Sequence, residues 1–169
     1  RNNGNSNPAN VSCGIVNNKF HGVFNELSSP QIQGSVIAFN LQDGINFIGS
    51  GTPLPPVVRS NSIASNLGDG IDLTDTGLLV INDNTIALNA VIGVNIKGAS
   101  APQVTHNWIV ANTVTDVVAN GDAATNISHN TYAECVITNA VGSLNLNPAG
   151  LIIPPNSAGI GGTSVPCTP

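Results

Sequence analysis

Apolar and polar residues alternate in short stretches along the chain, and the stretches return at a fixed spacing. The order apolar-x-x-Asn-x-apolar-x-x-Asn recurs every 23 residues. The anchor asparagines at this spacing are Asn61, Asn84, Asn107 and Asn130. Alternation over about four residues has the two-residue period of a β-strand, and no stretch is long enough for a stable helix. The pattern predicts an all-β repeat with three short strands in each period.

A period near 23 residues fits one turn of a solenoid, in which coils stack about 4.8 Å apart in parallel register. We expect about six coils over residues 13–144, a polar segment at 1–12 and a Pro- and Gly-rich covering tail at 145–169. Extra length before Asn61 coincides with 49–56 and predicts a loop insertion. The predicted core rows are Ile15, Ile32, Val58, Ile81, Val104 and Ile127; Phe20, Ile37, Ile63, Ile86, Ile109 and Tyr132; and Ile45, Ile71, Val94 and Val117.

The anchor asparagines form a further row, which Ser35 and Asn18 extend toward the N-terminus. Asn tolerates the left-handed backbone conformation of a sharp turn better than other non-Gly residues. Stacked amides can also hydrogen-bond from coil to coil. We expect the row to lie at a turn and to use both properties. In the sixth coil Cys135 takes the place of the last Asn.

The order Asn-x-Ile-x-x-Asn-x-x-x-Gly-Ile-x-Leu, clearest in 61–73 and 84–96, resembles the right-handed parallel β-helix repeat of pectate-lyase-like proteins. The resemblance covers about residues 14–135. That family contains polysaccharide lyases, glycoside hydrolases, epimerases, phage tailspikes and surface adhesins. The resemblance therefore implies a right-handed parallel β-helix and leaves the activity open, because the repeated residues are structural.

The densest group of carboxylates contains Asp69, Asp72 and Asp75. If the apolar residues beside Asp72 face the core, Asp72 faces outward in one row with Asn46 and Asn95. In the same register Asp69 lies over Asp43. Carboxylates one coil apart can bind Ca²⁺ or raise each other's pKa for acid and base chemistry. The alternative is that Asp69 and Asp75 cap turns and that Asp72 is solvated.

Residues 67–72 look similar to the Asn-Thr-Asp-Gly-x-Asp motif of polygalacturonase-like hydrolases. The paired Asp, the Gly-His-Gly and the Arg-Ile-Lys of those enzymes are absent from this chain. Lyases and epimerases that act on uronates need positive charge near the substrate carboxylate. Within the repeats only Arg59 and Lys97 could supply it, which disfavours an enzyme without excluding one.

Two further groups could carry chemistry. His106 and His129 occupy equivalent positions one coil apart, with Asp83 before them in the column. Such a column could hold Zn²⁺ or transfer protons, or its members are ordinary polar turn residues. Trp108 faces outward by alternation and could stack against a sugar ring.

The chain contains three cysteines, Cys13, Cys135 and Cys167. A disulfide between Cys135 and Cys167 would clamp the tail across the end of the solenoid and stabilise the fold by about 3 kcal/mol. It would leave Cys13 without a partner in this chain. Such a bond implies an oxidising compartment, so we expect an extracellular or cell-surface protein.

Composition narrows the functions further. The chain has 169 residues, a net charge of -5, only four Lys plus Arg and 25 Asn, so nucleic acid is not an expected partner. No apolar run approaches the roughly 20 residues that span a bilayer. We expect a noncatalytic structural or display rod, or a module that binds a surface glycan, with end-to-end self-association and no cofactor. The alternative is a polysaccharide-active hydrolase, lyase or epimerase that uses the Asp69, Asp72 and Asp75 face.

Overall fold

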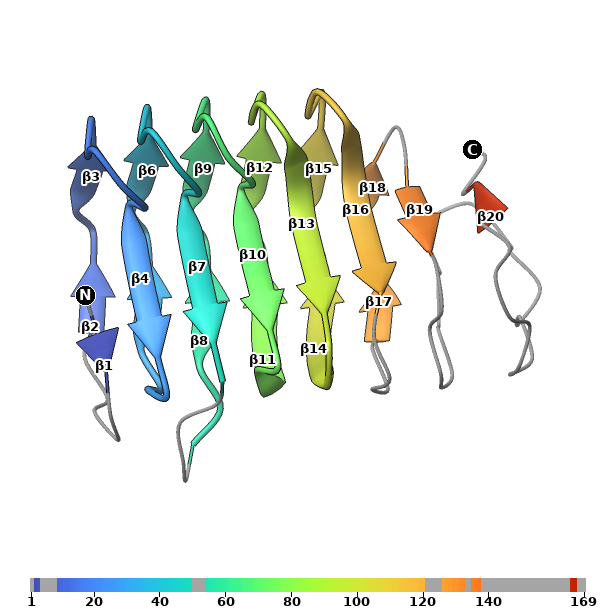
Figure 1. Cartoon of the computed structure of the whole chain (residues 1–169), viewed down its shortest axis with the longest axis horizontal. Coiled ribbons are helices and arrows are strands. Elements are labelled where there is room, and N and C mark those ends of the chain that lie inside the picture. The colour runs from blue at the N-terminus through green and yellow to red at the C-terminus, as the bar shows by residue number, and fades with distance from the viewer. Residues whose placement is uncertain are drawn as a thin grey trace.

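The computed structural model describes residues 2–3, 9–49, 54–120, 126–132, 135–137 and 165–166. These residues contain twenty strands and no helix. The strands form three sheets that run side by side along one axis (Figure 1). Within the described residues there is consequently no helix long and apolar enough to cross a membrane.

We call the three sheets A, B and C. Each turn of the chain contributes one strand to sheet B, then one to sheet C and then one to sheet A. Sheet A contains β1 (Asn2–Asn3), β4 (Val23–Glu26), β7 (Ile45–Ile48), β10 (Ile71–Thr74), β13 (Ile92–Lys97), β16 (Thr115–Asn120), β19 (Cys135–Ile137) and β20 (Val165–Pro166). Sheet B contains β2 (Ala9–Val11), β5 (Gln31–Gln33), β8 (Val57–Arg59), β11 (Gly77–Asn82), β14 (Ser100–Thr105) and β17 (Asn126–Ser128). Sheet C contains β3 (Gly14–Val16), β6 (Val36–Ala38), β9 (Ser62–Ala64), β12 (Thr85–Ala87), β15 (Trp108–Val110) and β18 (Thr131–Tyr132).

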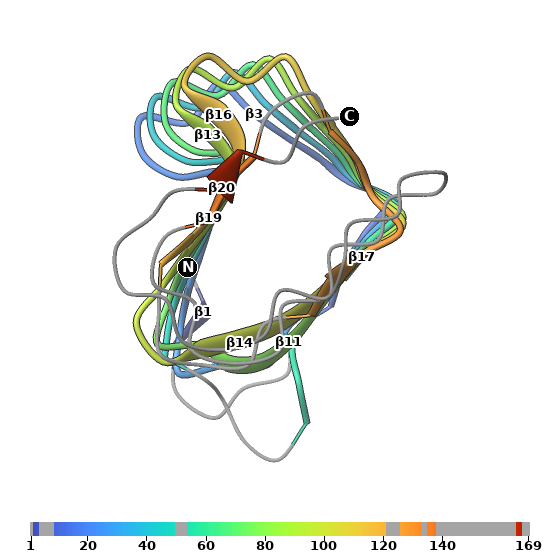
Figure 2. The ribbon, with the colours of Figure 1, turned by 90° about the vertical axis from the view of Figure 1, so that its right-hand side faces the viewer.

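Neighbouring strands pair in parallel, except that β20 pairs antiparallel with β19. Viewed along the rod, the coils lie over one another around a common interior (Figure 2). We call the turn from sheet B to sheet C the first corner, that from C to A the second, and that from A to B the third. The predicted parallel solenoid with three short strands in each period is confirmed. The predicted boundaries at residues 12 and 144 stay predictions, because much of both end segments lies outside the described residues.

The interior is filled by rows of aliphatic side chains, one from each coil. β-Branched residues dominate these rows because they suit a pleated strand packed on its inner face. The fully covered members of the three main rows include Ile32, Val58, Ile81 and Val104 in sheet B; Ile37, Ile63, Ile86 and Ile109 in sheet C; and Ile45, Ile71, Val94 and Val117 in sheet A. These rows agree with the prediction over the central coils.

The prediction was wrong for the first coil. Ile15 pairs with Ile37 in sheet C, and the place before Ile32 in sheet B belongs to Asn10. Phe20 is not in the core, since 68% of its surface is exposed at the second corner. The predicted alignment of Ile15 with Ile32 gave a first coil too short to pass through three strands and three corners. The actual offset between the first two coils is 22 residues, as the contact from Asn18 to Asn40 shows.

The anchor asparagines lie just after the first corner and are buried. Asn61 donates from its backbone N–H and from Nδ2 to Oδ1 of Asn84, at 2.9 and 3.0 Å, and also from Nδ2 to the Ile32 carbonyl. Asn84 repeats these bonds with Asn107, which repeats them with Asn130. The predicted coil-to-coil amide ladder is confirmed.

The expected left-handed backbone belongs to a different residue. The residue before each anchor adopts it, with φ of 55° at Ser60, 55° at Asp83, 56° at His106 and 57° at His129. The anchors themselves are needed for their amides, which satisfy the buried polar groups of the turn. This part of the prediction is therefore corrected.

A second amide ladder lies at the start of the second corner and consists of Asn18, Asn40, Asn66, Asn89 and Asn112. Asn18 belongs to this ladder and not to the first, so its predicted place was wrong. In the first ladder the corresponding position in coil one is Cys13, whose N–H donates to Ser35 Oγ at 3.3 Å. Cys13 is a free thiol.

The predicted place of Cys135, at the last Asn position of the sixth coil, was wrong. Cys135 does not follow Asn112, because its backbone pairs with Val117 in sheet A. Asp116 replaces the missing Asn, since its Oδ1 accepts the backbone N–H of Asn112 at 3.2 Å and the Asn112 Nδ2 at 2.9 Å. The last coil is shortened where the others make the second corner. Cys167 lies outside the described residues, so the disulfide to Cys135 stays a prediction.

Candidate functional site

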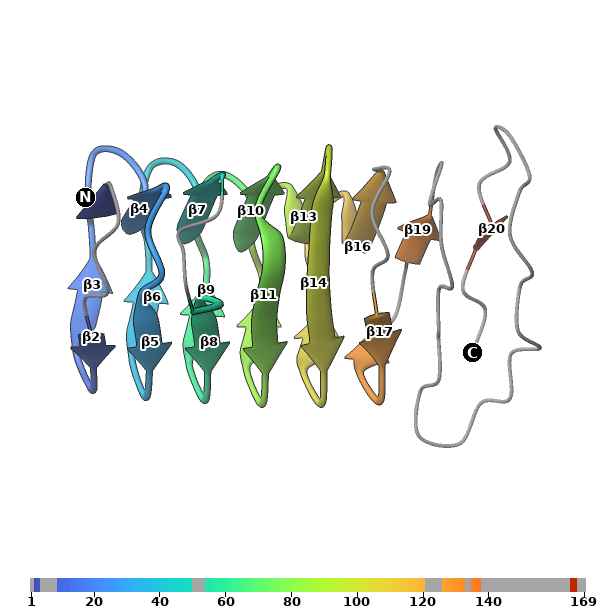
Figure 3. The same cartoon turned by 90° about the horizontal axis from the view of Figure 1, so that it is seen from below.

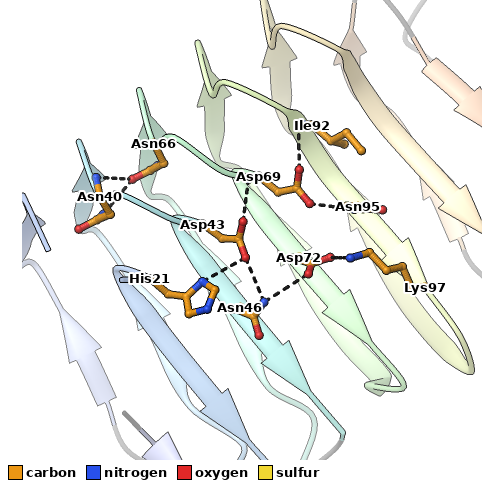
Figure 4. Close-up of polar contacts among 10 residues, drawn as sticks. All are labelled: His21, Asn40, Asp43, Asn46, Asn66, Asp69, Asp72, Ile92, Asn95 and Lys97. Carbon is orange, nitrogen blue, oxygen red and sulfur yellow. Dashed lines mark hydrogen bonds and ion pairs between the residues drawn. The ribbon is translucent and has the colours of Figure 1, made fainter. Parts of the chain in front are cut away.

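A group of polar side chains that connects several coils lies on the outer face of sheet A (Figure 4). Two rows of side chains build it, because the parallel register places each residue beside its equivalent in the next coil. The first row lies two residues before the strands of sheet A begin and contains His21, Asp43 and Asp69. The second row lies within the strands and contains Phe24, Asn46, Asp72 and Asn95. Its last three members are in the predicted register.

Asp43 connects the first three coils. Its Oδ1 accepts the backbone N–H of Asp69 at 2.8 Å. Its Oδ2 accepts Asn46 Nδ2 at 3.0 Å and lies 3.1 Å from His21 Nδ1. Both carboxylate oxygens are thus engaged within the protein.

Asp69 connects its own coil to the next coil in the same way. Its Oδ1 accepts the backbone N–H of Ile92 at 3.0 Å, and its Oδ2 accepts Asn95 Nδ2 at 2.8 Å. The predicted stacking of Asp69 over Asp43 is present. Each carboxylate closes the second corner of its coil against the backbone of the next coil.

Asp72 completes the site with an ion pair. Its Oδ1 lies 2.7 Å from Lys97 Nζ, and its Oδ2 accepts Asn46 Nδ2 at 3.2 Å. The Asp72 residue is 9% exposed, whereas the Lys97 side chain is 43% exposed. The outward direction of Asp72 was predicted, but its neighbours cover it.

Burial raises the pKa of Asp69 and of Asp72 above their ordinary value of 3.8. For Asp69 the hydrogen bonds from Asn95 and Ile92 oppose this rise, and the negative charges of Asp72 and Asp43 add to it. For Asp72 the bond and charge of Lys97 oppose the rise. Burial is the largest cause for both groups, because a carboxylate loses water that the few remaining donors do not replace.

The pH dependence of stability follows from the raised pKa of Asp69. The folded chain binds a proton on Asp69 more tightly than the unfolded chain, so this group destabilises the fold as the pH rises from 3.8 through its folded pKa. We expect the wild type to lose stability relative to Asp69→Asn over that window, and the difference to level off above it. Urea unfolding of both proteins between pH 3 and 7 measures this. A difference that stays constant, or that grows in favour of the wild type with rising pH, contradicts the prediction.

The structure separates the other predicted site residues from this group. Asp75 follows β10 at the third corner, is exposed, and accepts the Ala99 N–H at 2.8 Å. Trp108 lies in sheet C and is 55% exposed, with Thr85 and Thr131 beside it in register. The site therefore unites Asp43, Asn46, Asp69, Asp72 and Asn95, but it excludes Asp75 and Trp108.

Sequence reasoning missed His21 and Phe24. Their rings stack with centroids 5.6 Å apart, next to Asp43. The correct 22-residue offset of the first coil places His21 before Asp43 and Phe24 before Asn46 in their rows. That offset was the signal that could have found them.

The site offers oxygen ligands but no converging metal cluster. Among the residues that the structure describes, no group of three or more His, Cys, Asp or Glu side chains could hold a metal ion. A Ca²⁺ site at Asp43 and Asp69, which the sequence left open as an alternative to having no metal, stays untested. Both carboxylates accept hydrogen bonds from amides of the protein.

Stacked parallel strands, amide ladders and an aliphatic interior define a parallel β-helix. The profile of the family described as "right handed beta helix region" matches residues 2–137. The chain belongs to this right-handed β-helix family. No curated protein and no solved structure matches the chain.

Proposed function

We propose that this chain is a noncatalytic module of the cell exterior, a rigid rod whose outer faces display side chains. The carboxylates on sheet A carry the proposal. Both oxygens of Asp43 and of Asp69 are engaged in contacts to neighbouring side chains or to the backbone of the next coil. A general acid or nucleophile must present an oxygen to its substrate, whereas these oxygens fasten one coil to the next.

The location outside the cell rests on the sequence. The predicted disulfide between Cys135 and Cys167 would form and persist in an oxidising compartment.

Binding of a glycan is a second candidate function, and the exposed Trp108 favours it. Its indole stands on the outer face of sheet C between two threonines of the neighbouring coils, Thr85 and Thr131. An aromatic face beside hydroxyl groups can stack on a sugar ring and hydrogen-bond its edge. The site lies on a different sheet from Asp72.

A polysaccharide-active enzyme remains the competing hypothesis. The raised pKa of Asp72 and its contact with Lys97 favour this alternative, because a carboxyl with a raised pKa beside a cation suits acid and base chemistry on a uronate. The two hypotheses differ in whether the chain turns over a polysaccharide with Asp72 as a catalytic group.

An activity assay distinguishes the two hypotheses. The chain is incubated with pectin, alginate and rhamnogalacturonan, and the assay measures reducing ends for a hydrolase, unsaturated products for a lyase and epimerised units for an epimerase. We expect no product from the wild type, from Asp72→Asn or from the control Asp83→Asn, which changes an exposed carboxylate at the first corner. Product that the wild type and the control form, but folded Asp72→Asn does not, would overturn the proposal. In the same samples the fluorescence of Trp108, the single tryptophan of the chain, reports saccharide binding at sheet C.

A further inference from the structure

The first corner carries a column of residues that the proposed function does not use. They share the left-handed backbone conformation and lie one above another along the rod. The column consists of Ser12, Gly34, Ser60, Asp83, His106 and His129.

The last two members hold their imidazole rings against each other. The ring centroids of His106 and His129 lie 5.0 Å apart, with an angle of 11° between the ring planes. Both residues are exposed, and their φ angles are 56° and 57°. The residue after each histidine belongs to the first amide ladder, where Asn107 Nδ2 donates to Asn130 Oδ1 at 2.9 Å. The fold therefore fixes the two backbones at one coil spacing.

We propose that His106 and His129 form a two-ligand site for a divalent transition-metal ion of the kind that imidazole prefers, such as Zn²⁺, Ni²⁺ or Cu²⁺. Metal–nitrogen bonds of about 2.0–2.1 Å require the two nitrogens to come within roughly 4.2 Å of each other. The ring centroids lie 5.0 Å apart in a stacked arrangement, so metal binding requires the two exposed side chains to rotate and bring one nitrogen of each ring toward a common point.

The surroundings favour a cation. Asp83 stands one coil before His106 in the same column and is exposed, with its Oδ2 accepting Asn82 Nδ2 at 2.8 Å. Its carboxylate adds negative charge beside the pair. No third His, Cys, Asp or Glu of the described residues converges on the rings, so water fills the other coordination positions. The ligands are nitrogens, which separates this site in metal preference from the carboxylates of sheet A.

Calorimetric titration of the full chain with Zn²⁺, Ni²⁺ and Cu²⁺ at pH 7.5 tests the proposal. We expect one ion for each chain, with Cu²⁺ binding most tightly, and no competition from excess Ca²⁺. His106→Asn and His129→Asn should each lower the affinity at least about tenfold, because the second imidazole is supplied at a millimolar or higher effective concentration. Asn is chosen because it tolerates the left-handed backbone.

The chain has three histidines, so His21→Asn is the matched control and should bind as the wild type does. Equal binding by the wild type and His129→Asn, or an equal loss in His21→Asn, would overturn the proposal. A second measurement needs no variant: Ni²⁺ should broaden the ring-proton NMR signals of two histidines and spare the third. Broadening of all three, or of none, contradicts a site at the first corner. Neither result depends on whether the chain turns over a polysaccharide.

Discussion

Replacement of Asn84 by Ala is expected to destabilise the fold by about 3–5 kcal/mol, since several buried polar groups lose their partners at once. Oδ1 of Asn84 accepts both the backbone N–H and Nδ2 of Asn61, and its Nδ2 reaches the Val58 carbonyl and Oδ1 of Asn107. Asn84 is 2% exposed, so water cannot replace these bonds. A loss of this size is a large share of the 5–15 kcal/mol that stabilises a typical domain.

Equilibrium unfolding in urea measures the effect, and Asn82→Ala is its control. Asn82 is only partly buried and makes an exposed hydrogen bond with Asp83, so its loss should cost less than about 1 kcal/mol. Asn84→Asp separates acceptor from donor, because it retains an oxygen for Asn61 but loses the amide protons and buries a charge. It should be at least as damaging as Asn84→Ala. Equal stability of Asn84→Ala and Asn82→Ala would show that the ladder contributes little.

The central coils could be predicted from the sequence because they share one period. Once Asn61 is placed, a constant 23-residue step gives the register of every core residue up to Ile127. The inner rows are repeated aliphatic residues, and a shift by one residue would turn them outward. The outward row of Asn46, Asp72 and Asn95 follows from the same constraint.

The two ends could not be predicted because they depart from that period. The first coil is 22 residues from the second, and a misplaced Ile15 also hid the contact between His21 and Asp43. In the coil before the last, Asp116 stands where earlier coils have Gly93 and its equivalents, and it accepts from Asn112. The contacts of Asp69 are also beyond pattern reasoning, since they depend on which backbone N–H the second corner presents.

A row of glycines explains how the second corner can pass so close to its neighbours. Gly22, Gly44, Gly70 and Gly93 are equivalent in register. None needs a left-handed backbone. A methyl group on Gly70 would lie 2.6 Å from the Gly93 carbonyl oxygen, 2.6 Å from Ile86 Cγ2 and 2.8 Å from Asn89 Nδ2.

Gly70→Ala is therefore expected to destabilise the fold by about 3 kcal/mol, at the upper end of the cost of overpacking a core. The obstructing atoms belong to the backbone of the next coil, to the buried core residue Ile86 and to Asn89 of the second amide ladder, and none of them is free to rotate away. Relief requires the coils to separate at the second corner, which would also weaken the Asn66 to Asn89 contact. Amide hydrogen exchange should then quicken on both sides of β10 (Figure 3).

Gly14→Ala is the matched control, because a methyl group there meets nothing within 4 Å. It removes flexibility from the unfolded chain without a clash, so it should leave stability unchanged or raise it by up to about 1 kcal/mol. Urea unfolding of both variants measures the difference. If Gly70→Ala were as stable as Gly14→Ala, the coils could separate at little cost. The close approach at the second corner would then contribute nothing to the rigidity that a structural rod requires.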